Sequence, residues 1–185
     1  SLISMKEKLG RASDGDVLGK PLGGVSAVIS DENELLVAGP QMYERYLGDT
    51  EKAQYFYSGD LGKIEEDGTL VMLGRKKDMI IKQGYNIYPA LFETIISSIP
   101  GVHECAMIGV YNSFTEDEEV ILYVVKAESS TISTAELTHY LKNGQYSIDR
   151  AALPDKIIFI NELPYSGRSK KVSKAELRAM SERND

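Results

Sequence analysis

Two residues of opposite charge, Asp60 and Arg75, offer the most specific chemistry in this chain of 185 residues. Each follows a glycine, and a short apolar stretch lies between them. If that stretch folds as a hairpin, both side chains can point into one pocket. A carboxylate there accepts hydrogen bonds from both hydroxyls of a vicinal diol such as a ribose, and a guanidinium supplies forked donors beside it.

The elements that must position this pair are short strands joined by turns. Val25–Ser30 and Glu34–Ala38 form one predicted hairpin. Leu61–Glu65 and Thr69–Leu73 form the other, and the Asp67-Gly68 dipeptide between them is a strong turn signal. The second hairpin carries Asp60 and Arg75 at its two ends.

The rest of the chain mixes helices with strands. A helix is predicted from Pro89 until Pro100-Gly101, because apolar residues recur at helical spacing. Ser133 and Glu136 form a predicted capping box for another. The remaining predicted elements are strands at Met79–Ile81, Val102–Val110, Val120–Lys126 and Ile157–Ile160, and a last helix at Ser173–Met180. The α+β class therefore comprises two units, with a seam near Lys76-Lys77.

Composition limits the possible classes only broadly. The chain is 42% hydrophobic and 26% charged, as in an ordinary globular protein. A net charge of −7 argues against a nucleic-acid partner. The single cysteine, Cys105, excludes an internal disulfide and fits the reducing cytoplasm. No apolar run long enough for a transmembrane segment is present.

Several sequence blocks resemble the adenylate-forming (AMP-binding) superfamily, above all its acyl- and aryl-CoA synthetases, which are acid–CoA ligases. Glu34–Pro40 with Arg45-Tyr-Leu is similar to the segment GELxxxG…GYL, and Tyr57–Asp60 to YRTGD. Gly74–Glu93 is similar almost throughout to GRxxDxIkxxGxxixPxxiE, and Leu163–Arg178 to LPxTxxGKxxRxxLR. Arg45 replaces a usual glycine, and the last block is one residue longer than in the family.

The resemblance implies a domain organisation. Residues 1–76 correspond to the last β subdomain of the large AMP-binding domain, a distorted barrel. Residues 77–185 correspond to the mobile C-terminal domain, a short sheet flanked by helices. The phosphate loop, the segment that helps to hold Mg²⁺, and most of the acid pocket belong to a missing N-terminal part. The chain alone is therefore expected to be inactive.

The resemblance also implies the reaction. Such enzymes join a carboxylic acid to ATP as an acyl-AMP, with Mg²⁺, and most then transfer the acyl group to CoA. Asp60 and Arg75 would hold the ribose of ATP or AMP, and Lys171 would bridge the carboxylate and the α-phosphate. Because Lys170 stands where the family has glycine, it is the alternative lysine.

A hinge and a thiol channel are implied in the C-terminal domain. Lys77 is the expected pivot of a rotation between the two half-reactions. Gln83, Gly84 and Tyr85 are expected to line the channel for the pantetheine arm, where a Cβ at residue 84 would obstruct the thiol.

Alternative interpretations remain open at this point. The acceptor thiol could belong to a carrier-protein phosphopantetheine, as in peptide synthetase and fatty acyl-AMP ligase relatives. The chain could instead be a non-catalytic nucleotide-binding or regulatory module. Without their neighbours, Asp60 reads as a turn cap and Lys171 as a surface charge. The acidic run 115–119 reads as a solvated loop, and neither histidine has partners at metal-ligand spacing.

Overall fold

The computed structural model describes residues 15–40, 54–167 and 171–183. The chain divides into two compact units, residues 1–77 and 78–185, and each is described by itself. The predicted α+β class is confirmed. The assignment of residues 1–76 and 77–185 to two particular domains of a larger enzyme stays a prediction.

The first unit is a five-stranded antiparallel sheet with the order β1-β5-β4-β3-β2. Its strands are β1 (Asp16–Gly19), β2 (Ser26–Ile29), β3 (Glu34–Ala38), β4 (Phe56–Ile64) and β5 (Leu70–Arg75). Both predicted hairpins form, although β4 begins earlier than expected and β1 was not predicted. In the described residues the sheet is open rather than a closed barrel, because β1 and β2 each pair on one side only.

The turn between β4 and β5 follows from its sequence. The Glu65 amide donates to the Thr69 carbonyl at 2.9 Å, which closes the loop. Gly68 has a φ of 82°, a left-handed conformation that glycine adopts without strain. The Thr69 amide donates to the Asp67 carboxylate at 3.0 Å. This tight turn sets the register from Ile64 to Gly62, and a one-residue shift between Leu61 and Gly62 then brings Asp60 opposite Arg75.

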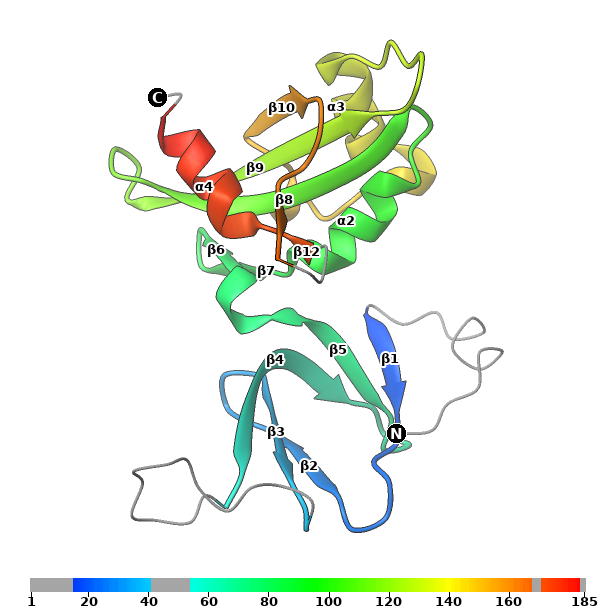
Figure 1. The fold of residues 1–185 in the computed structure, drawn as a ribbon, viewed down its shortest axis with the longest axis vertical. Coiled ribbons are helices and arrows are strands. Elements are labelled where there is room, and N and C mark those ends of the chain that lie inside the picture. The colour runs from blue at the N-terminus through cyan, green and yellow to red at the C-terminus, as the bar shows by residue number, and fades with distance from the viewer. Residues whose placement is uncertain (1–14, 41–53, 168–170, 184–185) are drawn as a thin grey trace. The chain divides into compact units, whose positions relative to one another are not determined.

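The second unit is built on a three-stranded sheet with the order β10-β9-β8 (Figure 1). Strand β8 (Val102–Asn112) is antiparallel to β9 (Asp117–Lys126), and β10 (Lys156–Ile160) runs parallel to β9. The other elements are α2 (Pro89–Ser97), α3 (Thr134–Lys142), α4 (Lys174–Glu182), the hairpin β6 (Ile80–Lys82) and β7 (Tyr85–Ile87), the hairpin β11 (Tyr165–Ser166) and β12 (Lys171–Val172), and the short 3-10 turns η2 (Gly144–Tyr146) and η3 (Arg150–Ala152). The 3-10 turn η1 (Lys76–Asp78) spans the boundary between the two units.

Both faces of this sheet are covered. On one face, apolar residues of α2, α3, β6 and β7 pack in a core that includes Ile96 and Leu137. On the other face, Leu177 of α4 packs with Tyr123 and neighbouring residues of β8 and β9. Figure 1 shows α4 crossing the sheet on its own side. The central strand therefore alternates between two cores along its length.

Two local signals read from the sequence are confirmed in the helices. Pro89 occupies the first turn of α2, where its missing amide costs nothing. Ser133 and Glu136 form the complete capping box at the start of α3, with each side chain bonded to the other residue's backbone amide. The Ser133 hydroxyl and amide hold the pKa of Glu136 below its usual value, since they stabilise the carboxylate.

The acidic run differs from its prediction as a solvated loop. Asp117, Glu118 and Glu119 are the first residues of β9, paired with Asn112, Tyr111 and Val110 of β8. Their side chains bond to other parts of the second unit, as described below. Within the described residues, no helix has the length and apolarity to cross a membrane.

Replacing Leu177 by alanine should destabilise the second unit. Leu177 is fully buried, and its truncation leaves a cavity against the β8–β9 face. The expected loss is about 2–5 kcal/mol of unfolding free energy, measured by urea denaturation followed by circular dichroism. Glu182→Ala, an exposed change on the same helix, should alter stability by less than about 0.5 kcal/mol. Equal effects of both variants would contradict the assigned packing.

Candidate nucleotide, thiol and lysine sites

Asp60 and Arg75 face each other across the β4–β5 ladder. The antiparallel register pairs their Cα atoms, and a bulge between Leu61 and Gly62 follows directly. Arg75 Nε lies 2.9 Å from Asp60 Oδ1. The carboxylate is more enclosed than the guanidinium, with 21% and 51% of the side chains exposed. The strand pairing thus brings together the two residues that the sequence analysis singled out.

The ion pair leaves hydrogen-bonding capacity on the carboxylate. Asp60 Oδ1 is buried, and among the described residues it accepts no aligned hydrogen bond, although Arg75 Nε is near. A buried acceptor without an aligned donor is unfavourable unless a ligand supplies one. The position therefore fits a ligand hydroxyl that donates to Asp60 beside a cation.

Glu34 fixes the turn before Asp60, a role that the sequence analysis did not assign. The residue is only 4% exposed. Its Oε1 accepts the Gly59 amide at 3.0 Å, and its Oε2 accepts Lys76 Nζ at 2.9 Å. Gly59 has a φ of 72°, so this backbone favours glycine. A buried acid in β3 thus holds the backbone next to Asp60.

Ser58 completes this support. Its hydroxyl donates to the Leu35 carbonyl at 2.7 Å and accepts the Asp60 amide at 3.0 Å. Both Asp60 and Gly59 therefore have their amides bonded to side chains of the same sheet. The backbone that carries the Asp60 carboxylate is therefore restrained by Glu34 at residue 59 and by Ser58 at residue 60.

The charges around Glu34 shift its pKa. The hydrogen bond from Lys76 is the main cause that lowers it, and the Gly59 amide adds to the effect against the opposing cost of burial. The same pairing, with Glu32 on the exposed side, raises the pKa of Lys76. Lys76 is therefore held as a fixed cation on the acidic end of β3.

Gly84 lies at the turn of the β6–β7 hairpin, next to Gln83. Their φ values, 78° and 51°, are both positive, as a two-residue hairpin turn of this kind requires. A Cβ added to Gly84 would meet no heavy atom within 4 Å. The space outside the turn is open, and Tyr85 beside it is 62% exposed. Backbone conformation, rather than packing within the chain, accounts for the glycine.

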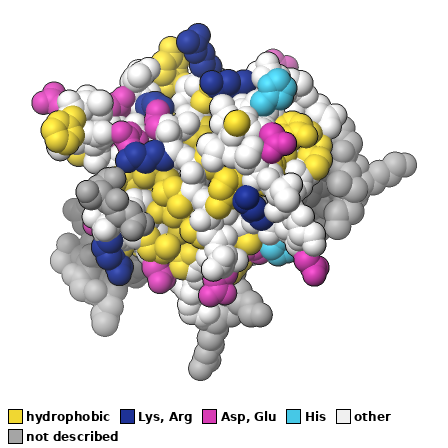
Figure 2. Space-filling view, turned by 90° about the horizontal axis from the view of Figure 1, so that it is seen from above, with side chains coloured by type: hydrophobic (Ala, Val, Ile, Leu, Met, Phe, Trp, Pro, Cys, Tyr) yellow, Lys and Arg dark blue, Asp and Glu magenta, His cyan; other side chains and the backbone are white. Residues whose placement is uncertain are grey.

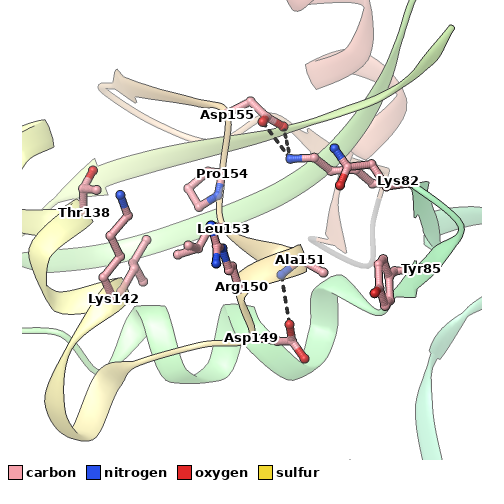
Figure 3. A pocket seen from close by; sticks show the side chains of 12 residues that line it. Lys82, Tyr85, Thr138, Lys142, Asp149, Arg150, Ala151, Leu153, Pro154 and Asp155 are labelled. Carbon is pink, nitrogen blue, oxygen red and sulfur yellow. Dashed lines mark hydrogen bonds and ion pairs between the residues drawn. The ribbon is translucent and has the colours of Figure 1, made fainter. Parts of the chain in front are cut away.

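A cleft of about 580 Å³ borders this hairpin (Figure 3). Lys82, Gln83 and Tyr85 form one wall. The other walls come from α3 and from the segment before β10, through Thr138, Leu141, Lys142, Asp149, Arg150, Ala151, Leu153, Pro154 and Asp155. Cations and carboxylates alternate around the opening, so the cleft has no single sign of charge.

Lys171 is the first residue of β12, in the short hairpin with β11. Its side chain is exposed. The hairpin is held by its flanks: the Ser173 amide donates to the Pro164 carbonyl at 2.7 Å, and the Tyr165 hydroxyl bonds both Glu104 oxygens at 2.8 Å. The Glu104 carboxylate raises the pKa of Tyr165, since the bond favours the protonated phenol. Lys170 lies outside the described residues.

Helix α4 is anchored immediately after Lys171. Lys174 Nζ lies 2.7 Å from Glu93 Oε1 and donates to the Met107 carbonyl at 3.1 Å. Glu93 also accepts the Met107 amide at 2.7 Å. The half-buried Lys174 thus joins α2, β8 and α4, while Lys171 projects from the edge of this assembly. The sequence analysis assigned no role to either Lys174 or Glu93.

Cys105 lies in β8 near this anchor. Its thiol donates to the Glu93 carbonyl at 3.4 Å and lies 3.3 Å from the Ser97 hydroxyl. Burial is the main cause that raises the pKa of Cys105 to about 11. The residue therefore remains a thiol at neutral pH, which is unfavourable for a nucleophile.

The distribution of charged side chains was compared with what a nucleic-acid or metal site requires. On the face that Figure 2 shows, acidic and basic side chains are interspersed and no broad basic field appears. Within the part of the chain that the structure describes, no three His, Cys, Asp or Glu residues gather at metal-binding distance.

The fold is that of the C-terminal portion of adenylate-forming enzymes. Residues 91–171 match the family model of the AMP-binding enzyme C-terminal domain, so this part of the chain belongs to that family. It is 30% identical over 166 residues to 2-succinylbenzoate–CoA ligase of Staphylococcus epidermidis, covering 84% of this chain and 34% of that protein. Indoleacetate–CoA ligase of Aromatoleum aromaticum is 34% identical over 153 residues, covering 80% and 29%.

Solved structures with a similar fold include enzymes of the same kind. The ATP-bound MatB of Rhodopseudomonas palustris superposes with a TM-score of 0.77 at 35% identity, over 89% of this chain and 35% of that one. The O-succinylbenzoate CoA synthetase of Bacillus subtilis, in complex with ATP and magnesium, superposes with a TM-score of 0.74 at 26% identity. The match covers 88% of this chain and 35% of that one. The chain spans about a third of the length of the curated relatives it matches.

The carboxylate of Glu34 should contribute stability that depends on pH. Its pKa is lowered from 4.5, so its contribution is complete above that value and is lost as the pH falls through the lowered pKa. The pKa of Lys76 is raised from 10.5, so the contribution of the ion pair is also lost as the pH rises through that raised pKa. The stability gap between wild type and Glu34→Gln should be widest between these limits, measured by urea denaturation.

Glu32→Gln is the matched control, because Glu32 also bonds Lys76 but is 73% exposed. Its stability gap should be smaller and should decline with added salt, as exposed ion pairs do. A gap for Glu34→Gln that stays constant across the acidic range would contradict the ionised, Lys76-bonded carboxylate.

Proposed function

We propose that this chain is the part of an AMP-forming acid–CoA ligase that binds the nucleotide ribose and performs the exchange between two half-reactions. The observation that carries the proposal is the buried Asp60 oxygen beside Arg75. Ribose hydroxyls of ATP or AMP would donate to Asp60, and Arg75 would supply the adjacent positive charge. The named CoA ligases among the relatives support this assignment.

In the first half-reaction, a carboxylate oxygen of the acid attacks the α-phosphorus of ATP. The bond from that phosphorus to the bridging oxygen breaks, and pyrophosphate leaves. Lys171 would bridge the two anions, because an ammonium offsets their repulsion and stabilises the charge that develops at phosphorus. Lys170 is the alternative to Lys171. The exposed position of Lys171 on β12 is compatible with reaching a substrate outside this unit.

In the second half-reaction, the CoA thiol gives up its proton to solvent, its sulfur attacks the acyl carbon, and the bond from that carbon to the AMP oxygen breaks so that AMP leaves with the bonding electrons. The turn at Gly84, flanked by Gln83 and Tyr85, would guide the pantetheine arm. Its open outer side supports close passage of a ligand. Lys77, the last residue of the first unit, is the proposed hinge between the two poses.

CoA is favoured over a carrier protein as the acceptor, because the curated relatives at these identities are named as CoA ligases. Mg²⁺ neutralises the phosphates of ATP in chemistry of this kind. By resemblance to these relatives, of which the chain spans about a third, its ligands and most of the acid pocket would belong to an N-terminal domain that partners this chain. A cytoplasmic location remains a prediction.

Removing the charge at Lys171 should separate the two half-reactions in the full-length protein. Lys171→Ala should slow acyl-AMP formation on the order of 10²–10³-fold. Thioester formation from preformed acyl-AMP should stay close to wild type. Pyrophosphate release and thioester formation are measured separately, with Lys170→Ala as the matched variant. Loss of adenylation in Lys170→Ala alone would transfer the role to Lys170, and no effect of either would favour a non-catalytic module.

The isolated chain should not turn over. Incubated with ATP, Mg²⁺, CoA and a panel of aryl and fatty acids, it should release no AMP above background, because the phosphate loop of the family is not among its residues. Addition of the N-terminal domain in trans is the informative companion experiment. Steady AMP release by the chain alone would show that this sequence contains a complete site.

A further inference from the structure

The β6–β7 hairpin is bonded to carboxylates of a different part of the second unit. We propose that Asp117, assisted by Asp155 and Glu118, is a positioning residue that presets the Gln83-Gly84 turn for the thiol half-reaction. This inference rests on the proposed function, which assigns the turn to the pantetheine channel. It adds residues that lie outside the short motifs named in the sequence analysis but inside the matched C-terminal domain, residues 91–171.

Asp117 bonds the turn at its most demanding position. The Gln83 amide donates to both carboxylate oxygens, at 3.1 and 2.9 Å. Gln83 is a non-glycine residue with a φ of 51°, a conformation that costs free energy unless its surroundings hold it. A charged acceptor at its amide supplies such a restraint, since hydrogen bonds to ionised groups are the stronger kind. Asp117 is itself oriented by the Glu118 amide, at 2.9 Å.

Two further carboxylates act on the strand before the turn. Glu118 accepts the Ile81 amide. Asp155 bonds Lys82 Nζ through both oxygens, at 2.7 and 2.6 Å, and Figure 3 shows this pair at one side of the cleft. Asp155 also accepts the Val120 amide at 2.8 Å, so it is fixed to β9. Three consecutive residues of the hairpin, 81 to 83, are therefore each bonded to an acid.

The restraints engage residues 81 to 83 and leave the space at Gly84 open. The amide of Gln83 and the ammonium of Lys82 are engaged by acids, whereas the position of a Cβ on Gly84 has no neighbour within 4 Å. The hairpin is thus held by acids at residues 81 to 83, while Gly84 remains accessible. Such restraints are expected of a loop that must hold the pantetheine arm in a fixed position and orientation.

Asp117→Ala and the milder Asp117→Asn test the proposal in the full-length protein. Thioester formation from preformed acyl-AMP should fall on the order of 10- to 100-fold for alanine and less for asparagine, which keeps one oxygen acceptor. Pyrophosphate release and the melting temperature should stay close to wild type. Glu116→Ala is the matched control, because Glu116 is an exposed acid next to Asp117, in the turn between β8 and β9.

Hydrogen exchange gives a readout that does not depend on activity. In the present chain, the Gln83 amide should be protected in wild type and in Glu116→Ala, and should exchange faster in Asp117→Ala. An unchanged thioester rate in Asp117→Ala, or equal losses in both half-reactions together with a lower melting temperature, would overturn the positioning role.

The proposed function fails in a distinguishable way. A wild-type protein that forms acyl-AMP but transfers the acyl group to no thiol, or that forms no acyl-AMP, refutes the function and removes the role of the turn. A wild-type protein that completes both steps while Asp117→Ala does the same refutes only the positioning inference.

Discussion

The register between β8 and β9 is the constraint on which the second unit depends. Strand β9 is buried on both faces, and its residues alternate between the α2–α3 core and the α4 core. A slip of one residue would exchange the two sets of side chains and expose the acids at the start of β9 to the wrong partners. Because Asp117 and Glu118 begin this strand, the same register that packs the cores also delivers carboxylates to the β6–β7 turn.

The two units use the same physical device to hold a turn. In the first, the buried Glu34 accepts the amide of Gly59 next to Asp60. In the second, Asp117 accepts the amide of Gln83 next to Gly84. In both places a residue in the left-handed region lies beside a proposed ligand-contacting residue. An ionised acceptor at a backbone amide stabilises such a turn without filling the space on its ligand side.

Elements with local signals were predictable from the sequence. The Asp67-Gly68 turn, the proline at the start of α2 and the Ser133–Glu136 capping box each depend on residues within a few positions. The proximity of Asp60 and Arg75 was also predictable from the hairpin, whereas their direct pairing depends on a bulge between Leu61 and Gly62 that was not predicted.

The contacts that the sequence did not reveal join distant positions. Glu34 meets Gly59 and Lys76 across the sheet, and Glu93 meets Lys174 between two helices. No spacing rule encodes these pairs, since they arise only when the sheet and the helices pack. The acidic run was misinterpreted for the same reason: dense acids usually mark a solvated loop, whereas here Asp117, Glu118 and Glu119 each have a partner outside their own turn.

The state of Cys105 matters for an enzyme that handles activated acyl groups. Mixed anhydrides of acids with AMP react readily with thiolates, so an ionised cysteine nearby would divert the acyl group onto the protein. Cys105 is the one cysteine of the sequence, and its thiol stays protonated because burial raises its pKa to about 11. The single cysteine of this sequence is therefore a poor nucleophile, and under the proposed function it would not compete with an external thiol for the acyl group.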